Sequence, residues 1–265
     1  NLAAGGAATS ILARLNSIPL YVVDVGVEAY PAPEPGPGMH WHRVDVGGNV
    51  GDLVHSDAMD AIALAGALAA GASMIDAISA DTRVIILGEM GIGNTTPASA
   101  LGARLLDLDA EAMVGPGTGL YGNALDTKRA NVQKALERTN GIGTAMDVLR
   151  CLGGREIAAI VGAMGRAVER GMAILVDGFI VSCAALVAIK HEPQIRDHMW
   201  FGHRSAEPGH THILESLCAR PLIDAGLRLG EGSGALTAFP LVKAAVALHN
   251  QMATFKEAAV PEREK

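Results

Sequence analysis

"RVIILGEMGIGNTTPASA", residues 83–100, joins a short apolar run to a glycine-rich turn and then to an alanine-rich segment. The apolar, partly β-branched VIIL predicts a strand covered on both faces. The glycines of the turn permit a tight bend and bring backbone N–H groups close to whatever lies there. The Asn-Thr-Thr-Pro that follows favours a helix start, and a helix N-terminus favours an anion. Because Glu89 is itself an anion, a carboxylate beside an anion site is predicted, which suggests chemistry on a phosphorylated substrate.

The composition of the 265 residues limits the classes of protein that the chain can belong to. Its length suits one large domain, or a large domain with a small lobe. Aromatic residues make up only 3% of the chain and there are 32 glycines, so the core must use small aliphatic side chains at close approach. A net charge of −7 argues against nucleic acid or an anionic membrane as a partner, and any phosphate site must therefore be local.

The cysteines and the apolar runs indicate a cytoplasmic protein. Cys151, Cys183 and Cys218 are odd in number and widely separated, so we expect buried free thiols in a reducing compartment. The longest uncharged runs, 61–75 and 179–189, are too short to span a bilayer.

Apolar strand-like runs alternate with helical patterns along the chain. This alternation predicts an α/β fold with a doubly wound, mostly parallel sheet, helices on both faces and sites at the strand carboxyl ends. We expect one domain over 1–265, with a core of about 18–240 and a small lobe of terminal helices. The segment 225–252 is expected to close the core. Strands are predicted at 20–27, 84–87, 172–178 and 198–203, and helices at 1–16, 57–75, 97–106, 124–138, 154–171 and 179–190.

A second Gly-Glu turn repeats the pattern of the first. "LRLGEGSGALTA", residues 227–238, has apolar residues, then Gly-Glu, then small residues opening a helix. If both strands point the same way, Glu89 and Glu231 lie on one rim. Between them come "GPGTG" (115–119), "VDGF" (176–179) and "GHRSAEPGH" (202–210), which are small-residue turns with hydroxyl or charged groups. Such a concentration predicts a site rather than a set of ordinary turns.

Each of these features also has an ordinary structural interpretation. Asp177 could cap a helix beginning near Phe179, and Ser205 and Glu207 could belong to a capping pattern before the next helix. Lys128 could face solvent. The Gly-x-Gly-x-Gly turn around Glu231 lacks the downstream acidic residue of a dinucleotide site, and no P-loop motif is present.

Two His-x-His pairs raise the question of a metal site. They are His40 with His42 and His210 with His212. On a strand such a pair places both rings on one face, but zinc usually takes cysteine or carboxylate ligands alongside. We therefore expect no metal.

Several stretches, in order, resemble the nicotinate-nucleotide–dimethylbenzimidazole phosphoribosyltransferase family of cobalamin biosynthesis. They cover nearly the whole chain and are "NLAAGGAATSILAR" (1–14), "VVDVGV" (22–27), "GEMGIGNTT" (88–96), "GGREIAAIVGA" (153–163), "LVDGFI" (175–180), "HRSAEPGH" (203–210) and "RLGEGSGA" (228–235). The resemblance implies a Rossmann-like parallel sheet with a small helical lobe, a homodimer, and a reaction that needs no metal or organic cofactor. That reaction moves phosphoribose from nicotinate mononucleotide to dimethylbenzimidazole with inversion, giving α-ribazole phosphate and nicotinate.

The resemblance also implies roles for individual residues. Glu231 is expected to be the general base that takes a proton from the benzimidazole, and Glu89 is expected to stabilise developing positive charge or hold the ribose. The residues that it places around the substrates are Gly91, Gly93, Asn94, Gly117, Thr118, Gly119, Lys128, Asp177, Gly178, Ser205, Leu229, Gly232 and Gly234.

Some segments depart from the family pattern. Family members usually extend further at the N-terminus, where extra helices complete the small lobe and part of the base pocket. The stretches 31–56 and 120–124 are divergent and could change which base is accepted. The alternatives are therefore transfer to another benzimidazole, a purine or a phenolic ring, and a non-catalytic nucleotide-binding relative. A purely structural domain does not explain two Gly-Glu turns.

Overall fold

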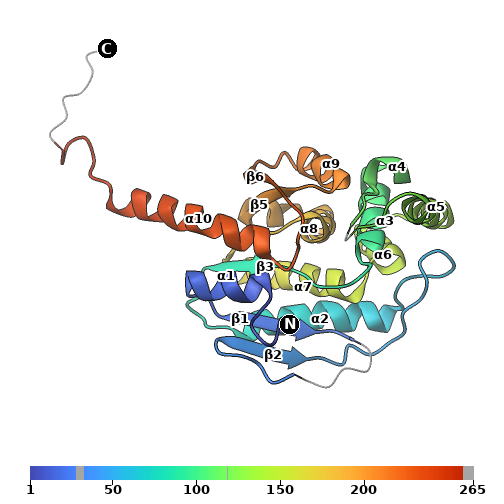
Figure 1. The fold of residues 1–265 in the computed structure, drawn as a ribbon, viewed down its shortest axis with the longest axis horizontal. Helices are drawn as coiled ribbons and strands as arrows, with labels where there is room; N and C mark the ends of the chain where they lie inside the picture. The colour runs from blue at the N-terminus through green and yellow to red at the C-terminus, as the bar shows by residue number, and fades with distance from the viewer. Residues whose placement is uncertain (28–32, 118, 259–265) are drawn as a thin grey trace, which may run out of the picture.

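A four-stranded sheet, parallel throughout, organises the structure, which is a computed structural model describing residues 1–27, 33–117 and 119–258 (Figure 1). Its strands follow chain order, and they are β3 (Val84–Leu87), β4 (Ala173–Val176), β5 (Met199–Ser205) and β6 (Pro221–Leu227). A separate parallel pair consists of β1 (Leu20–Asp24) and β2 (Met39–Arg43). The prediction of a mostly parallel α/β fold is confirmed.

The register of the four strands brings their carboxyl ends to one edge of the sheet. Leu87 pairs with Val176, Val176 with Phe201, and Ser205 with Leu227. The turns that carry Glu89 and Glu231 therefore emerge at the same edge, as the sequence predicted.

Helices cover both faces of this sheet, and the alternation along β4 shows how. Ile174 and Val176 belong to the main hydrophobic core, which includes the buried face of α8 (Phe179–His191). Leu175 points the other way and packs with Ala235 and Val242 of α10 (Ser233–Gln251). Because both faces are covered, β4 is continuously apolar rather than alternating.

Small residues set the helix packing, as the low aromatic content predicted. In α2 (Ala61–Ala77), a Cβ at Gly71 would lie 1.7 Å from the carbonyl oxygen of Ala159 in α7 (Arg155–Glu169). A Cβ at Gly162 of α7 would lie 2.0 Å from the carbonyl oxygen of Leu68. Side chains larger than hydrogen would therefore force the two helices apart.

The remaining helices complete the core and the approaches to the sheet edge. They are α1 (Ala8–Asn16), α3 (Thr95–Leu106), α4 (Ala110–Met113), α5 (Asn123–Arg138), α6 (Ala145–Leu152), the 3₁₀ turn η1 (Pro193–His198) and α9 (Pro208–Ser216). The predicted strands and helices exist at or near their expected positions, but β2, β6, α4, α6 and η1 were not among them. In the described residues, no helix is long and apolar enough to cross a membrane.

The expectation that residues 225–252 close the core is only half right. The first turns of α10 lie against the sheet, where Ala235, Leu236 and Ala238 are buried. The second half projects away from the rest of the chain (Figure 1) and exposes Val246 and Leu248. With 19 residues, α10 is about 28 Å long, whereas the four residues of β3 or β4 span about 13 Å, so the helix extends past the strands.

Candidate active site at the strand carboxyl ends

The two Gly-Glu turns are in direct contact. The backbone N–H of Glu231 donates to the carbonyl oxygen of Glu89 at 3.2 Å. A Cβ at Gly88 would lie 2.4 Å from the backbone nitrogen of Gly232, so only glycine permits this approach. Glu231 itself has a φ of 62°, in the left-handed region that a side chain rarely adopts. Strained, non-glycine backbone of this kind is concentrated at functional sites.

The Glu231 carboxylate is half-buried and faces the start of α1. The backbone N–H of Thr9 lies 3.5 Å from Oε2 of Glu231, across 222 residues of chain. The N-terminal segment therefore forms one wall beside this carboxylate.

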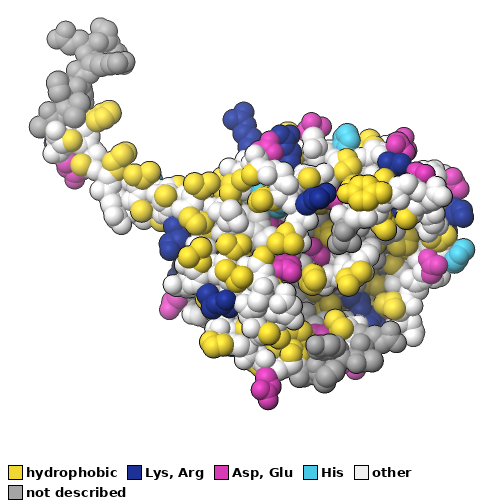
Figure 2. Space-filling view, in the orientation of Figure 1, with side chains coloured by type: hydrophobic (Ala, Val, Ile, Leu, Met, Phe, Trp, Pro, Cys, Tyr) yellow, Lys and Arg dark blue, Asp and Glu magenta, His cyan; other side chains and the backbone are white. Residues whose placement is uncertain are grey.

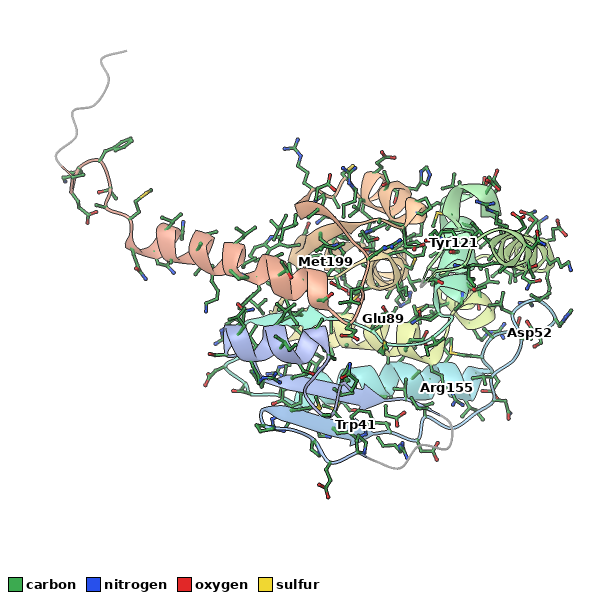
Figure 3. All side chains as sticks on the ribbon, viewed as in Figure 1. Trp41, Asp52, Glu89, Tyr121, Arg155 and Met199 are labelled. Carbon is green, nitrogen blue, oxygen red and sulfur yellow. The ribbon has the colours of Figure 1, made fainter. Side chains whose placement is uncertain are left out.

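Glu89 occupies the middle of the molecule, at the end of β3 (Figure 3). Burial raises the pKa of its carboxyl group to about 7, and the nearby carboxylates of Asp177, Glu156 and Glu231 contribute to the rise. The side-chain amide of Asn94, which precedes α3, donates a hydrogen bond to Oε2 of Glu89 and opposes this rise in pKa. Glu89 therefore changes its charge close to neutral pH.

Asp177 is buried and anchors the N-terminus of α10. Its carboxylate accepts the backbone N–H of Gly232 at 3.2 Å and that of Ala235 at 2.8 Å. The interpretation in which Asp177 caps the helix after it is wrong, because Gly178 is the N-cap of α8 and makes no side-chain cap. Asp177 instead fixes the turn that carries Glu231.

Lys128 lies inside the site and does not face solvent. Its Nζ donates to Oγ1 of Thr95 at 2.9 Å and to the carbonyl oxygen of Gly115 at 2.8 Å. Burial lowers the pKa of this ammonium, while the charge of Glu207 opposes the change. A buried cation next to the N-terminus of α3 is suited to binding a phosphate.

Glu207 holds the glycine-rich loop that faces Lys128. Its Oε1 accepts the backbone N–H of Gly117 at 2.9 Å, and it makes no side-chain cap on α9. Gly117 and Gly119 have φ values of 58° and 129°, which explains the glycines of this turn. The predicted site residue Thr118 lies outside the described residues.

Ser205 belongs to a buried polar network behind the site. Nδ1 of His210 accepts the backbone N–H of Ser205 at 2.9 Å, so the ring proton lies on Nε2 and is directed to Oγ of Ser182 at 2.9 Å. Burial lowers the pKa of His210 to about 3. A neutral, fully bonded imidazole supports the loop and has no free nitrogen for a metal.

The other predicted residues lie in the turns around this centre. A Cβ at Gly178 would meet Nε2 of His203 at 3.2 Å, and one at Gly234 would overlap the same ring. The side chain of Leu229 is 66% exposed. Gly91 and Gly93 belong to the turn before α3, where Gly93 has a φ of 88°.

Three side chains in or near the site were not among the residues that the sequence predicted for it. Glu156 contributes to the charge around Glu89, His203 lies 3.5 Å from Asp177 through Nε2, and Glu207 binds the Gly117 turn. Glu156 stands inside a stretch that resembles the family, and its position at a helix N-terminus after two glycines was the available signal.

The fold and the site define an α/β protein with two neighbouring glutamates and a buried lysine at the carboxyl ends of parallel strands. A protein-family model described as "Phosphoribosyltransferase" matches residues 1–260. The nicotinate-nucleotide–dimethylbenzimidazole phosphoribosyltransferase of Pseudomonas syringae pv. syringae is 48% identical over 265 residues, covering 99% of this chain and 74% of that protein. The protein of the same description from Azotobacter vinelandii is 47% identical over 262 residues, covering 98% of this chain and 74% of its own.

A solved structure agrees with these relatives. The crystal structure of CobT from Thermus thermophilus superposes with a TM-score of 0.90 at 42% identity, covering 99% of this chain and 78% of that one. The chain therefore belongs to the nicotinate-nucleotide–dimethylbenzimidazole phosphoribosyltransferase family.

Proposed function

We propose that the chain transfers phosphoribose from nicotinate mononucleotide to dimethylbenzimidazole, forming α-ribazole 5′-phosphate and nicotinate in cobalamin lower-ligand synthesis. The observation that carries this proposal is the pairing of Glu89 and Glu231, which meet through their backbones at one sheet edge. A protein that only bound a nucleotide would have no use for two half-buried carboxylates beside the sugar.

Glu231 acts as the general base. One benzimidazole nitrogen attacks the anomeric carbon as the bond from that carbon to the nicotinate nitrogen breaks, and Glu231 takes the proton from the other benzimidazole nitrogen. The pair of electrons in the broken bond stays with nicotinate, which leaves as a neutral pyridine ring. Attack opposite the leaving group inverts the anomeric carbon and gives the α-linkage.

Glu89, Lys128 and the N-terminus of α3 stabilise the rest of the transition state. The sugar becomes positively charged as nicotinate leaves, and an ionised Glu89 stabilises that charge. The phosphate is held by Lys128 and by the N-terminus of α3, next to which Lys128 lies. These groups bind an anion locally, although the chain as a whole carries a net charge of −7.

The acceptor base meets an apolar rim. Met90 and Ile92 follow Glu89, and Leu229 precedes Glu231, with exposed fractions of 64%, 94% and 66%. Flat apolar contacts of this kind suit an aromatic ring, and they do not by themselves separate dimethylbenzimidazole from another benzimidazole, a purine or a phenolic ring. Those rings are the second candidate acceptors.

A chromatographic assay with nicotinate mononucleotide and a panel of these bases tests the proposal. We expect nicotinate release with a matching riboside phosphate. Glu231→Gln should lower kcat by about two or more orders of magnitude while nucleotide binding, measured by calorimetry, is preserved. Glu89→Gln should also slow turnover, whereas Glu137→Gln, exposed on α5, should not. Unchanged turnover in Glu231→Gln would refute its assignment as the base.

We further propose that the protein works as a cytoplasmic homodimer in which the outer half of α10 forms part of the interface. The projecting arm exposes apolar side chains (Figure 2), which include Leu241 near the middle of α10, Val246 and Leu248 in its outer half, and Met252 directly after it. A monomer would leave this surface in water. Cys151 and Cys183 are buried free thiols, which suit a reducing compartment, whereas the expectation that Cys218 is buried is wrong, because this residue is exposed. Sedimentation analysis of the chain and of a Val246→Glu, Leu248→Glu variant tests the dimer, which should dissociate in the variant.

A further inference from the structure

His203 lies against the N-termini of two helices. It belongs to β5 and is only 3% exposed, although its imidazole ring is polar. A Cβ at Gly178, the N-cap of α8, would lie 3.2 Å from Nε2 of the ring. A Cβ at Gly234, in the first turn of α10, would lie 2.0 Å from Cδ2 and 2.2 Å from Nε2. The ring therefore occupies the space that a side chain at Gly234 would need.

The ring also contacts the carboxylate that anchors α10. Its Nε2 lies 3.5 Å from Oδ1 of Asp177, the same oxygen that accepts the backbone N–H of Ala235 at 2.8 Å. The other ring nitrogen, Nδ1, is buried and has no hydrogen-bond partner among the described residues. Because a buried N–H without an acceptor is unfavourable, the ring proton belongs on Nε2, where it faces the carboxylate.

A second imidazole restrains the first. The centroids of the His203 and His210 rings are 6.2 Å apart, and the rings meet edge to face at 73°. His210 is itself held by the hydroxyl of Ser182 and the backbone N–H of Ser205. Close-packed backbone and a hydrogen-bonded ring therefore surround His203, which leaves its ring little freedom to turn away from Asp177.

The turn that Asp177 anchors needs a restraint of this kind. Gly230, Glu231 and Gly232 have consecutive φ values of 82°, 62° and 77°, all in the left-handed region. Glycine adopts this conformation freely, but Glu231 does so at a cost that its surroundings must offset. The Asp177 carboxylate accepts the N–H of Gly232, the residue directly after Glu231. The position of Glu231 therefore depends on the position of the Asp177 carboxylate.

We propose that His203 is a positioning residue for the transfer reaction proposed above: its Nε2–H holds the Asp177 carboxylate against the N-terminus of α10 and so fixes the turn that presents Glu231. His203 acts through Asp177 and is not itself a partner of the substrates. The inference rests on the proposed function for its kinetic consequence, but not for the interaction between the two side chains.

This role predicts an effect on the chemical step rather than on nucleotide binding. Glu231 takes its proton during the reaction, whereas Lys128 holds the phosphate of the nucleotide. A displaced Glu231 should therefore lower kcat and leave the dissociation constant of nicotinate mononucleotide, measured by calorimetry, unchanged. His203→Leu removes the ring N–H but keeps a branched apolar side chain in the same space, so kcat should fall by about tenfold or more.

His203→Gln is the conservative variant that tests the role of Nε2. The amide nitrogen of glutamine can take the place of Nε2 and donate to Asp177, so this variant should recover most of the activity that His203→Leu loses. A ring that only filled space would give the opposite order, because leucine fills an apolar space better than glutamine. His191→Leu, which changes an exposed histidine at the end of α8, is the matched control and should keep wild-type kcat.

Two further measurements test the link between His203 and Asp177. In a double-mutant cycle on kcat, His203→Leu should have little further effect in the Asp177→Asn background, since both changes act on the same turn. Nitrogen NMR of protein labelled at histidine needs no activity, and the ring of residue 203 should show the Nε2–H tautomer. Its Nε2 signal should move in Asp177→Asn but not in Asp81→Asn, which changes an exposed aspartate.

The outcomes are distinguishable. A proton on Nδ1 of His203 in the wild-type protein overturns the inference even if every variant fails to fold. An unchanged kcat in His203→Leu, a lower kcat in His203→Gln than in His203→Leu, or an Nε2 signal that does not respond to Asp177→Asn also overturns it. Failure of the wild-type chain to release nicotinate overturns the proposed function, while the NMR measurements still test the interaction of His203 with Asp177.

Discussion

Gly88→Ala tests whether the contact between the two Gly-Glu turns is required for the reaction. The added Cβ would lie 2.4 Å from the nitrogen and 2.6 Å from the Cα of Gly232, and 2.8 Å from the carbonyl carbon of Glu231. Ordinary contacts of a Cβ begin at 3.4 Å, so the turn must move by about 1 Å. All three atoms are backbone atoms and cannot rotate away.

Gly88→Ala should lower both the free energy of unfolding and kcat. Overpacking of this kind costs about 1–3 kcal/mol in the free energy of unfolding. A displacement of about 1 Å between reacting groups lowers kcat by about 100-fold. Because Glu231 donates its backbone N–H to Glu89, the same movement breaks the hydrogen bond that joins the two carboxylate-bearing turns.

Denaturant unfolding and the nicotinate-release assay measure these two effects. Gly165→Ala is the matched control, since it lies inside α7 with nothing within 4 Å of its added Cβ. It should keep wild-type turnover and gain up to about 1 kcal/mol in stability, because alanine is the better helix former. A Gly88→Ala protein with wild-type kcat and unfolding free energy would show that the two turns need not touch.

The remaining predictions concern buried polar groups. The unfolded chain protonates His210 below about pH 6.5 while burial keeps the pKa of this residue in the folded protein at about 3, so acidification through this window should lower the free energy of unfolding by up to about 1.4 kcal/mol per pH unit. His210→Gln should lack this contribution in pH-dependent urea titrations, and an unchanged slope would contradict it. Asp177→Asn should cost about 2–3 kcal/mol in denaturant unfolding, because an amide cannot replace both charged acceptor oxygens at α10; a loss below about 0.5 kcal/mol would contradict the anchoring role. Lys128→Met should weaken calorimetric binding of nicotinate mononucleotide by about tenfold or more, and Lys134→Met, exposed on the same helix, should not; equal effects would remove Lys128 from the phosphate site.

Much of the fold could be predicted from local patterns in the sequence. VIIL and AILV are apolar runs of strand length that each precede a glycine-containing turn, and the structure has strands at Val84–Leu87 and Ala173–Val176. Parallel strands place their carboxyl ends together, so the common rim of Glu89 and Glu231 followed from the repeated Gly-Glu pattern. The resemblance to a known family supplied the reaction and the residue roles, which pattern alone did not give.

Other features depend on contacts between distant segments. Asp177 lies one residue before the N-cap of α8, yet its carboxylate accepts from Gly232 and Ala235, 55 and 58 residues further along the chain. No local pattern distinguishes this use of the Asp177 carboxylate from an ordinary helix cap. The end of α10 has the apolar composition of a core helix, but it extends past the short strands and is exposed.

The sequence by itself determined most of the segments that become strands and helices, and that two carboxylates share one edge of a sheet, because periodicity, glycine turns and parallel pairing are local or topological properties. Only the tertiary structure decided which charges meet. Glu89, Asp177 and Glu231 come from three separate regions of the chain, and burial where they meet raises the pKa of Glu89 to about 7. Desolvation and charge repulsion depend on distances in space, and the order of residues does not contain those distances.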